Sequence, residues 1–285
     1  MDNSVKHLEK YFKNQTTPFE YFFSTNGNNK HITYNGSIPD LVSHLYLTGC
    51  SFVETRSGIP VFEKSTIFPY YPIFSYFSTL GVDFENKSVL DFGGNNGNLI
   101  RSSNNKIQDK MYTCVDIDKQ GLSDGEQSFP NAKWMHYNRY HPVYNKLGDK
   151  TALPNIEQYD IIIANSVFNH FTNEEILFFV DYLYNHLTPS GKFYFTWCNI
   201  DNEYCFNTFK KIRSPIFSEF EKPISKTYAY MCNNKQADSI IEGTEYLLTF
   251  HNKDYLLELL ENYNPKHYDA FSTWPLDCIE IEKVK

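Results

Sequence analysis

From residue 88 onward the chain alternates short apolar runs with stretches of helical length, and this pattern constrains the fold more than any other feature. The runs are Ser88–Phe92, Tyr112–Val115, Trp134–Tyr137, Tyr159–Ala164 and Lys192–Trp197. Short apolar runs spaced in this way are typical of βαβ units, whose parallel strands are buried on both faces. Five such strands with crossovers predict a doubly wound α/β sheet.

One connecting helix can be placed closely. The segment Thr172-Asn173-Glu174-Glu175 combines capping residues with acidic charge, as expected in the first turn of a helix. Apolar residues at helical spacing continue to Leu187, and Pro189-Ser190-Gly191 then ends the helix. The pattern therefore predicts a helix between the fourth and fifth strands.

Two other regions depart from the alternating pattern. Within residues 1–86, Leu41–Leu47 and Pro72–Leu80 carry helix-like spacing among glycines and prolines, so we expect a helical N-terminal cap. Residues 198–243 fit no single period and are predicted to be an insertion after the fifth strand. We expect a core domain over 87–285, with the cap and the insertion forming a lid over the substrate.

The end of the chain regains a regular pattern. The sequence predicts strands over Tyr246–Phe250 and Cys278–Val284, with a helix over Lys253–Asn262 between them.

Charge and composition exclude several classes of partner. The net charge of -8 and the pI of about 5.6 disfavour nucleic acid, because phosphate binding needs clustered Lys and Arg. No apolar stretch is long enough to cross a bilayer, so we expect a cytoplasmic protein without a membrane partner. The six cysteines show no CxxC pair and no histidine at metal-ligand spacing, which predicts neither a disulfide framework nor a metal site. The oligomeric state leaves no signal in the sequence.

Aromatic residues are abundant, with 24 Phe and 22 Tyr. Some could line a pocket for a planar or cationic substrate. Codon bias in an AT-rich genome raises Phe and Tyr together with Asn, which is also plentiful, and we attribute most of the enrichment to it.

The segment Val89–Asn98 carries the clearest chemical signal. It is an apolar strand that runs into a glycine-containing turn and then a predicted helix. Gly93 and Gly97 permit a tight turn and close approach of a ligand to the backbone, and Asp91 can anchor the loop amides or a ligand amine. Asp116 stands at the end of the next strand, where an acid can accept two hydrogen bonds from a ribose diol. The order of these features predicts a nucleoside-binding site.

The turn does not fit a dinucleotide. That fingerprint needs glycine at its third and sixth positions, which here hold Asn95 and Asn98. A pyrophosphate cradle is therefore disfavoured.

Together these residues resemble the class I S-adenosylmethionine-dependent methyltransferases, specifically the small-molecule branch. The resemblance rests on Val89–Gly97 as the first motif, Asp116 as the acid after the second strand, and Asp160–Phe171 as the motif of the fourth strand. It covers residues 87–197 well and the first 86 not at all. It implies a Rossmann-like sheet and S-adenosylmethionine as the cosubstrate.

The resemblance also implies roles for individual residues. The implied cofactor-binding residues are Gly93, Gly94 and Gly97 along the homocysteine and ribose path, Asp116 at the ribose hydroxyls, Asn138 near the adenine amino group, and Asn165 with Ser166 at the methionyl part. Asp91, Asn95, Ile117 and Arg139 are expected to bind the cofactor with them. Two positions depart from the family pattern. Asn95 replaces a common glycine and either crowds the ligand or adds a polar contact. Asn138 replaces an acid near the adenine amino group, although its amide oxygen can still accept a hydrogen bond.

The fourth-strand motif bears on the acceptor. It reads Ser-Val-Phe-Asn-His rather than the Asn-Pro-Pro-Tyr pattern that accompanies methylation of planar amide or nucleobase nitrogens. The resemblance therefore implies a small-molecule acceptor, with aromatic and amine-containing compounds among the candidates, in a setting such as secondary metabolism.

His170 is the candidate general base, because an imidazole titrates near neutral pH and this residue follows the fourth strand. It could equally cap the next helix or pack beside the pocket. His136 and His141 are weaker candidates, since the third strand usually faces adenine. Tyr70 and Tyr71 could cover the methionyl end or simply pack.

Three alternatives remain open from sequence. The first is intramolecular cyclisation of S-adenosylmethionine, which would release methylthioadenosine. The second is a nicotinamide-dependent reductase, which Asn95 and Asn98 disfavour. The third is a non-catalytic nucleoside-binding module that keeps the fold.

Overall fold

The computed structural model describes residues 19–25, 28–34, 50–56, 59–64, 73–142, 144–203, 205–207, 227–232, 235–237, 246–270 and 276–284. The chain forms two compact units, Met1–Thr79 and Leu80–Lys285, and each is described by itself. No helix in the described residues has both the length and the apolar character needed to cross a membrane.

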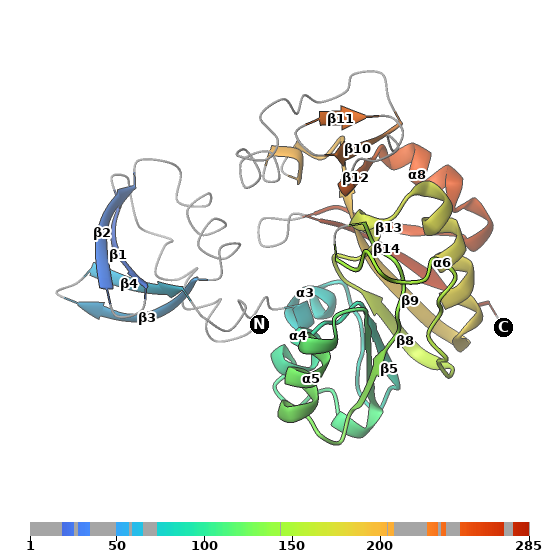
Figure 1. Ribbon diagram of the computed structural model, residues 1–285, viewed down its shortest axis with the longest axis horizontal. Coiled ribbons are helices and arrows are strands. Elements are labelled where there is room, and N and C mark those ends of the chain that lie inside the picture. The colour runs from blue at the N-terminus through green and yellow to red at the C-terminus, as the bar shows by residue number, and fades with distance from the viewer. Residues whose placement is uncertain are drawn as a thin grey trace. The chain divides into compact units, whose positions relative to one another are not determined.

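The second unit is built on a parallel sheet whose strands match the five predicted runs (Figure 1). These strands are β5 (Val89–Phe92), β6 (Tyr112–Asp116), β7 (Lys133–His136), β8 (Tyr159–Ala164) and β9 (Leu187–Asn199). They lie in the order β7-β6-β5-β8-β9, and all four neighbouring pairs are parallel. The order reverses direction between β5 and β8, as in a doubly wound sheet, so the predicted Rossmann-like fold is confirmed.

Strands from the end of the chain extend this sheet beyond β9. They are β10 (Tyr228–Cys232), β11 (Lys235–Ala237), β12 (Tyr246–His251), β13 (Lys266–Tyr268) and β14 (Asp277–Glu282). β14 pairs antiparallel with β9 and β13 pairs with β14, while β12 pairs parallel with the last residues of β9 and continues through β10 to β11. β9 therefore joins the central sheet to both extensions.

Helices cover both faces of the central sheet (Figure 1). They are α4 (Asn98–Ser102), α5 (Lys119–Ser128), α6 (Asn173–Asn185) and α8 (Lys253–Leu259), with single 3₁₀ turns η1 (Asp109–Met111), η2 (Phe168–His170) and η3 (Glu261–Tyr263). The predicted start of α6 is confirmed by a capping box, in which Thr172 Oγ1 accepts from the Glu175 amide and the Glu175 carboxylate accepts from the Thr172 amide. The helix ends at Asn185, and β9 already begins at Leu187, before the predicted turn.

The core lies between the central sheet and the two helices α6 and α8. Phe92 of β5 packs against Phe179 of α6 at 5.4 Å between ring centroids, and Phe168 stacks on Phe195 of β9 at 4.3 Å. All four rings are fully buried. Burial of large aromatic rings supplies much of the apolar area that stabilises a fold, so several of the abundant Phe residues serve packing.

The first unit corrects one expectation. Its described residues form β1 (Phe19–Thr25), β2 (Asn28–Tyr34), β3 (Cys50–Arg56) and β4 (Ile59–Lys64), in a sheet of order β2-β1-β4-β3. The prediction of a helical cap is therefore wrong for these segments, because aromatic and β-branched residues at close spacing favour strands. The helix expected near Pro72–Leu80 is present as α3 (Ile73–Thr79), and Leu41–Leu47 lies outside the described residues.

Candidate functional site

The glycine loop follows β5 and owes its shape to residues at positive φ. Gly93 has φ 76°, and a Cβ there would lie 2.2 Å from Val167 Cγ2, so only glycine fits. A Cβ on Gly94 would lie 2.5 Å from the Asp91 carboxyl carbon. Asn95 has φ 50°, a conformation that asparagine tolerates better than most residues. The replacement of a family glycine by Asn95 therefore preserves the backbone of the loop.

Asp116 ties this loop to the end of β6. Its Oδ2 accepts a 2.8 Å hydrogen bond from the Asn95 amide, and its Oδ1 accepts one of 2.8 Å from the Asp118 amide. Burial raises the pKa of Asp116, and these backbone hydrogen bonds oppose the shift. Each carboxylate oxygen can accept a further bond, so the group can still receive two hydroxyls. Ile117, the next residue, is half-buried and presents its amide to the same carboxylate.

Asp91 lies beneath the loop and is almost completely buried, with 3% of its surface exposed. The Tyr112 hydroxyl donates a hydrogen bond to its Oδ2. Burial raises the pKa of Asp91 to about 7, the Tyr112 bond lowers it, and the nearby charge of Asp116 raises it further. Close to neutral pH this carboxyl group is therefore partly protonated, and a cation brought near it would favour the ionised form.

The end of β8 meets the loop from the other side. Val167 packs against Gly93, and the Ser166 amide donates to Thr196 Oγ1 at 2.7 Å. Ser166 has φ 57°, and the Thr196 hydroxyl also contacts Asn165 Oδ1 at 3.4 Å. The structure thus brings the first and fourth motifs together at the carboxyl edge of the sheet.

The residues after β7 are engaged differently from what the resemblance implies. Asn138 Oδ1 accepts from the side-chain amide of Asn145 at 3.1 Å within a turn of residues 138–149. The Arg139 guanidinium lies over the Phe179 ring at 4.7 Å and is 3.7 Å from Glu175 Oε1, so it packs against α6. Both side chains have structural partners, and their contact with adenine stays a prediction.

His170 lies in a cluster of rings that the sequence did not reveal. Its ring centroid is 5.8 Å from that of His141 and 5.2 Å from that of Tyr144, and the latter two rings stack at 4.8 Å. Burial and the neighbouring His170 lower the pKa of His141 to about 4, and its Nδ1 accepts the Tyr144 amide proton. His141 is thus neutral at neutral pH. Tyr70 and Tyr71 lie outside the described residues.

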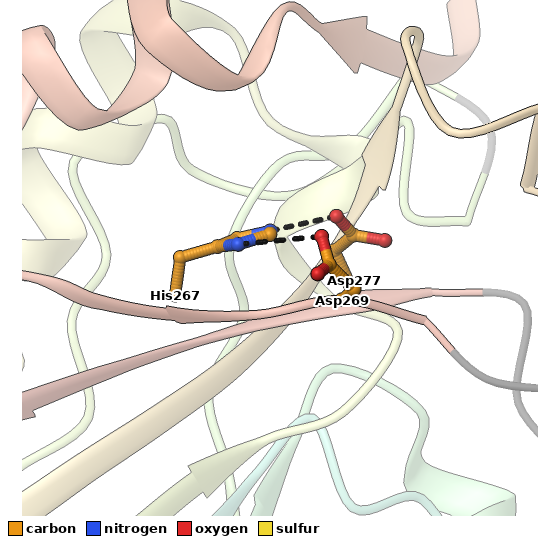
Figure 2. Close-up of side chains that lie close together, drawn as sticks. All are labelled: His267, Asp269 and Asp277. Atoms are coloured by element: carbon orange, nitrogen blue, oxygen red, sulfur yellow. Dashed lines mark hydrogen bonds and ion pairs between the residues drawn. The ribbon is translucent and has the colours of Figure 1, made fainter.

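A second polar cluster lies beside β9, where β13 ends and β14 begins (Figure 2). His267 Nε2 is 2.7 Å from Asp277 Oδ2, and its Nδ1 is 3.6 Å from Asp269 Oδ1. These three side chains could each offer one ligand atom to a metal ion. Asp277, however, also accepts from three further protein donors, the side-chain amides of Asn199 and Asn202 and the backbone amide of Ala270. Its carboxylate is saturated, which suits a structural hydrogen-bond network better than a metal centre.

Comparison with known proteins gives a family match over part of the chain. Residues 90–193 match the profile of a family described as a methyltransferase domain. No curated protein matches the sequence. Among solved structures, magnesium protoporphyrin IX methyltransferase from Synechocystis PCC 6803 is 13% identical, with 75% of this chain and 81% of that chain covered and a TM-score of 0.44. A methyltransferase from Clostridium acetobutylicum ATCC 824 is 13% identical, with coverages of 76% and 92% and a TM-score of 0.45. Values of this size say nothing of substrate or site residues.

Proposed function

We propose that this chain, whose residues 90–193 match a methyltransferase-domain model, is a class I S-adenosylmethionine-dependent methyltransferase that transfers the sulfonium methyl group to a small-molecule acceptor. The products are the methylated acceptor and S-adenosylhomocysteine. One observation carries the proposal: the glycine loop is held by Asp116 on one side and packs against Val167 on the other. The residues expected at the ribose and at the methionyl group therefore belong to a single edge of the sheet.

The chemistry of this edge suits a nucleoside that carries a positive charge. Asp116 accepts the ribose hydroxyls, since its oxygens retain capacity beyond the two backbone bonds. Asp91 and Asp116 supply negative charge around the loop, and the pKa of Asp91 is raised chiefly by burial and further by the charge of Asp116. A cationic ligand relieves that repulsion. The turn at Asn95 and Asn98 gives no support to a dinucleotide.

Methyl transfer itself needs little more than alignment. The sulfonium is an activated electrophile, and holding the acceptor nucleophile in line with the methyl carbon and sulfur can contribute about 7 to 11 kcal/mol. Where the acceptor arrives protonated, His170 removes its proton. Two observations support this role: His170 follows Ser166 by one short turn, and its ring lies in contact with the rings of His141 and Tyr144.

The acceptor is a small molecule rather than a nucleic acid. The net charge of -8 disfavours a phosphate backbone as the partner. Aromatic and amine-containing compounds of secondary metabolism are the acceptors to test first.

Calorimetric titration with S-adenosylmethionine and S-adenosylhomocysteine tests the cosubstrate. Asp116→Asn should weaken binding about 10- to 100-fold, because charge-assisted hydrogen bonds to the ribose contribute roughly 1.5 to 3 kcal/mol. Asp124→Ala is the matched control, since Asp124 is an exposed acid of α5 that contacts Gln120. Equal affinity of the native protein and the Asp116 variant would remove Asp116 from the site. Release of methylthioadenosine in place of S-adenosylhomocysteine would identify cyclisation instead of methyl transfer.

A further inference from the structure

Three buried polar side-chain atoms without a hydrogen-bond partner among the described residues lie in one region. They are Asn169 Oδ1, Trp197 Nε1 and Thr249 Oγ1, on side chains that are 4%, 1% and 0% exposed. A buried polar atom without a partner costs about 1 to 3 kcal/mol, so native proteins rarely keep one without a reason. Three in adjoining elements call for an explanation.

The topology places the three residues in neighbouring elements at the carboxyl end of β9. In the parallel pairing of β12 with β9, Phe250 lies opposite Cys198, which makes Thr249 and Trp197 neighbours in register. Asn169 belongs to η2, which packs on both strands, and the preceding Phe168 stacks on Phe195 of β9. Phe195 and Trp197 lie on the same face of β9, because side chains alternate along a strand.

Two polar rings that neighbour Trp197 already have hydrogen-bond partners of their own. His251 lies 6.5 Å from Trp197 between ring centroids, and its Nε2 is 2.8 Å from Asn173 Oδ1. Burial lowers the pKa of His251 to about 3, which keeps its ring neutral. On the other side of Trp197, His267 is bonded to Asp277.

We propose that Asn169, Trp197 and Thr249 form a binding site for an uncharged hydrogen-bonding group of the methyl acceptor. The indole N–H can only donate, the Asn169 carbonyl oxygen accepts, and the Thr249 hydroxyl can do either. The complementary ligand group both accepts and donates without a net charge, as an alcohol or a carboxamide does. The site rests on the proposed function for its occupant, since η2 begins two residues after Ser166, which is expected at the methionyl group.

The same three atoms would behave differently if a permanent structural water satisfied them. A water bonded to Thr249 stabilises the free protein, so its loss would lower the melting temperature. An acceptor group, by contrast, is absent from the free protein. In the unliganded protein these buried polar atoms then have no hydrogen-bond partner, which lowers the free energy of unfolding. Replacing one of them by an apolar group of the same shape should therefore raise stability.

Thermal unfolding of Thr249→Val separates these cases. We expect its Tm to equal or exceed that of the native protein, because valine removes only an unpartnered hydroxyl. Thr196→Val is the matched stability control: it lies on β9, and its hydroxyl accepts the Ser166 amide, so its Tm should fall by about 2 °C or more. A fall in Tm for Thr249→Val as large as that of the control would overturn the proposal.

Binding is tested on the native protein with small probes. The chain has only three tryptophans, so the Trp197 indole N–H resonance can be assigned with Trp197→Phe. Benzamide and benzyl alcohol should shift that resonance, Thr249→Val should weaken their binding at least 5-fold, and benzoate and benzylammonium should leave it unmoved. A Trp197 resonance that no neutral probe moves would contradict the site.

The two proposals fail in distinguishable ways. Calorimetry with S-adenosylhomocysteine does not involve Thr249, so both the native protein and Thr249→Val should bind it equally. Binding of S-adenosylhomocysteine without any response to the probes would overturn the acceptor site and leave the methyltransferase proposal intact. A response to the probes without binding of S-adenosylhomocysteine would overturn the proposed function, and the polar site would stand alone.

Discussion

The two sides of the candidate site differ in how their polar groups are satisfied. Around β5 and β6, the Asp116 carboxylate and the Asn95 amide are bonded to each other before any ligand arrives. Around the ends of β9 and β12, Trp197 and Thr249 are buried without partners among the described residues. The first side is preformed and needs little reorganisation to bind a nucleoside. The second side has hydrogen-bonding groups that are unpaired before a ligand binds. Such groups favour a ligand that can form hydrogen bonds with them over one that cannot.

The largest expected effect is on the rate of methyl transfer, and it comes from substitution of His170, which follows β8. His170→Ala should lower the single-turnover rate of methyl transfer by roughly 10² to 10⁴ if His170 is the base, with S-adenosylhomocysteine affinity nearly unchanged. The native rate should also fall on acidification, because a protonated imidazole cannot accept the proton of the acceptor. Rapid-quench measurements across pH check both points.

His136→Ala is the matched control, because His136 is an exposed histidine at the end of β7. His170→Asn should behave like the alanine variant, since asparagine cannot take up the proton. A His170→Ala protein with the native rate and the native pH profile would leave this residue a packing role only.

A second prediction concerns the preformed side. The pKa of Asp91 is about 7 in the folded protein, because burial disfavours its charge, and about 3.8 is the ordinary value. The unfolded chain therefore releases this proton at lower pH than the folded chain does. Protonated Asp91 contributes about a few kcal/mol to the free energy of unfolding. This contribution is fully present below about pH 4 and is lost as the pH rises to about 7.

Urea unfolding of the native protein and of Asp91→Asn between pH 4 and 8 measures this contribution as a difference. The subtraction is needed because Asp160 and Glu280 have lowered pKa values and contribute with the opposite sign. The advantage of Asp91→Asn over the native protein should grow with pH and level off above about 7. Parallel curves for the two proteins would show that Asp91 is ionised throughout.

The smallest expected effect is a change in stability caused by substitutions of Asn95 in the glycine loop after β5. Asn95→Gly should keep the backbone at its positive φ and lose only the exposed hydrogen bond from Asn95 Nδ2 to Asp118, so stability should change by no more than about 0.5 kcal/mol. Asn95→Ala places a Cβ-bearing residue without a polar side chain at φ 50° and should cost about 1 kcal/mol or more. Equal stability of the two variants in chemical unfolding would mean that the loop relaxes away from this conformation.

The central fold could be read from the sequence because its signals are local. Each of the five strands is a short apolar run, and the Thr172 capping box marks the start of α6 within four residues. β1 to β4 were missed although Asn26-Gly27 and Ser57-Gly58, dipeptides typical of hairpin turns, separate their pairs in the sequence. Glycine and proline also mark breaks between helices, so they do not by themselves distinguish a hairpin turn from a helix end. β13 was missed because three residues are too short to show a period.

Some residues of the candidate site could also be predicted from local sequence, and others could not. Asp91, Asp116 and the loop glycines could be named from sequence because consecutive elements carry them at fixed spacing. The stacking of His141 and Tyr144 near His170 could not, since the turn of residues 138–149 brings together positions about 30 residues apart. The unpartnered state of Thr249 is also invisible in sequence, because it depends on what every neighbouring element offers to its hydroxyl.

The length of β9 has a consequence for the energetics of binding. Thr196 of this strand accepts a hydrogen bond from Ser166, which follows β8 and is expected at the methionyl group, and Trp197, the next residue, belongs to the proposed acceptor site. A strand paired with β8, β14 and β12 cannot shift at one of these positions without moving the other. Occupancy of the two sites should therefore be thermodynamically linked. If the bound cosubstrate changes the affinity for the acceptor by some factor, the bound acceptor must change the affinity for the cosubstrate by the same factor.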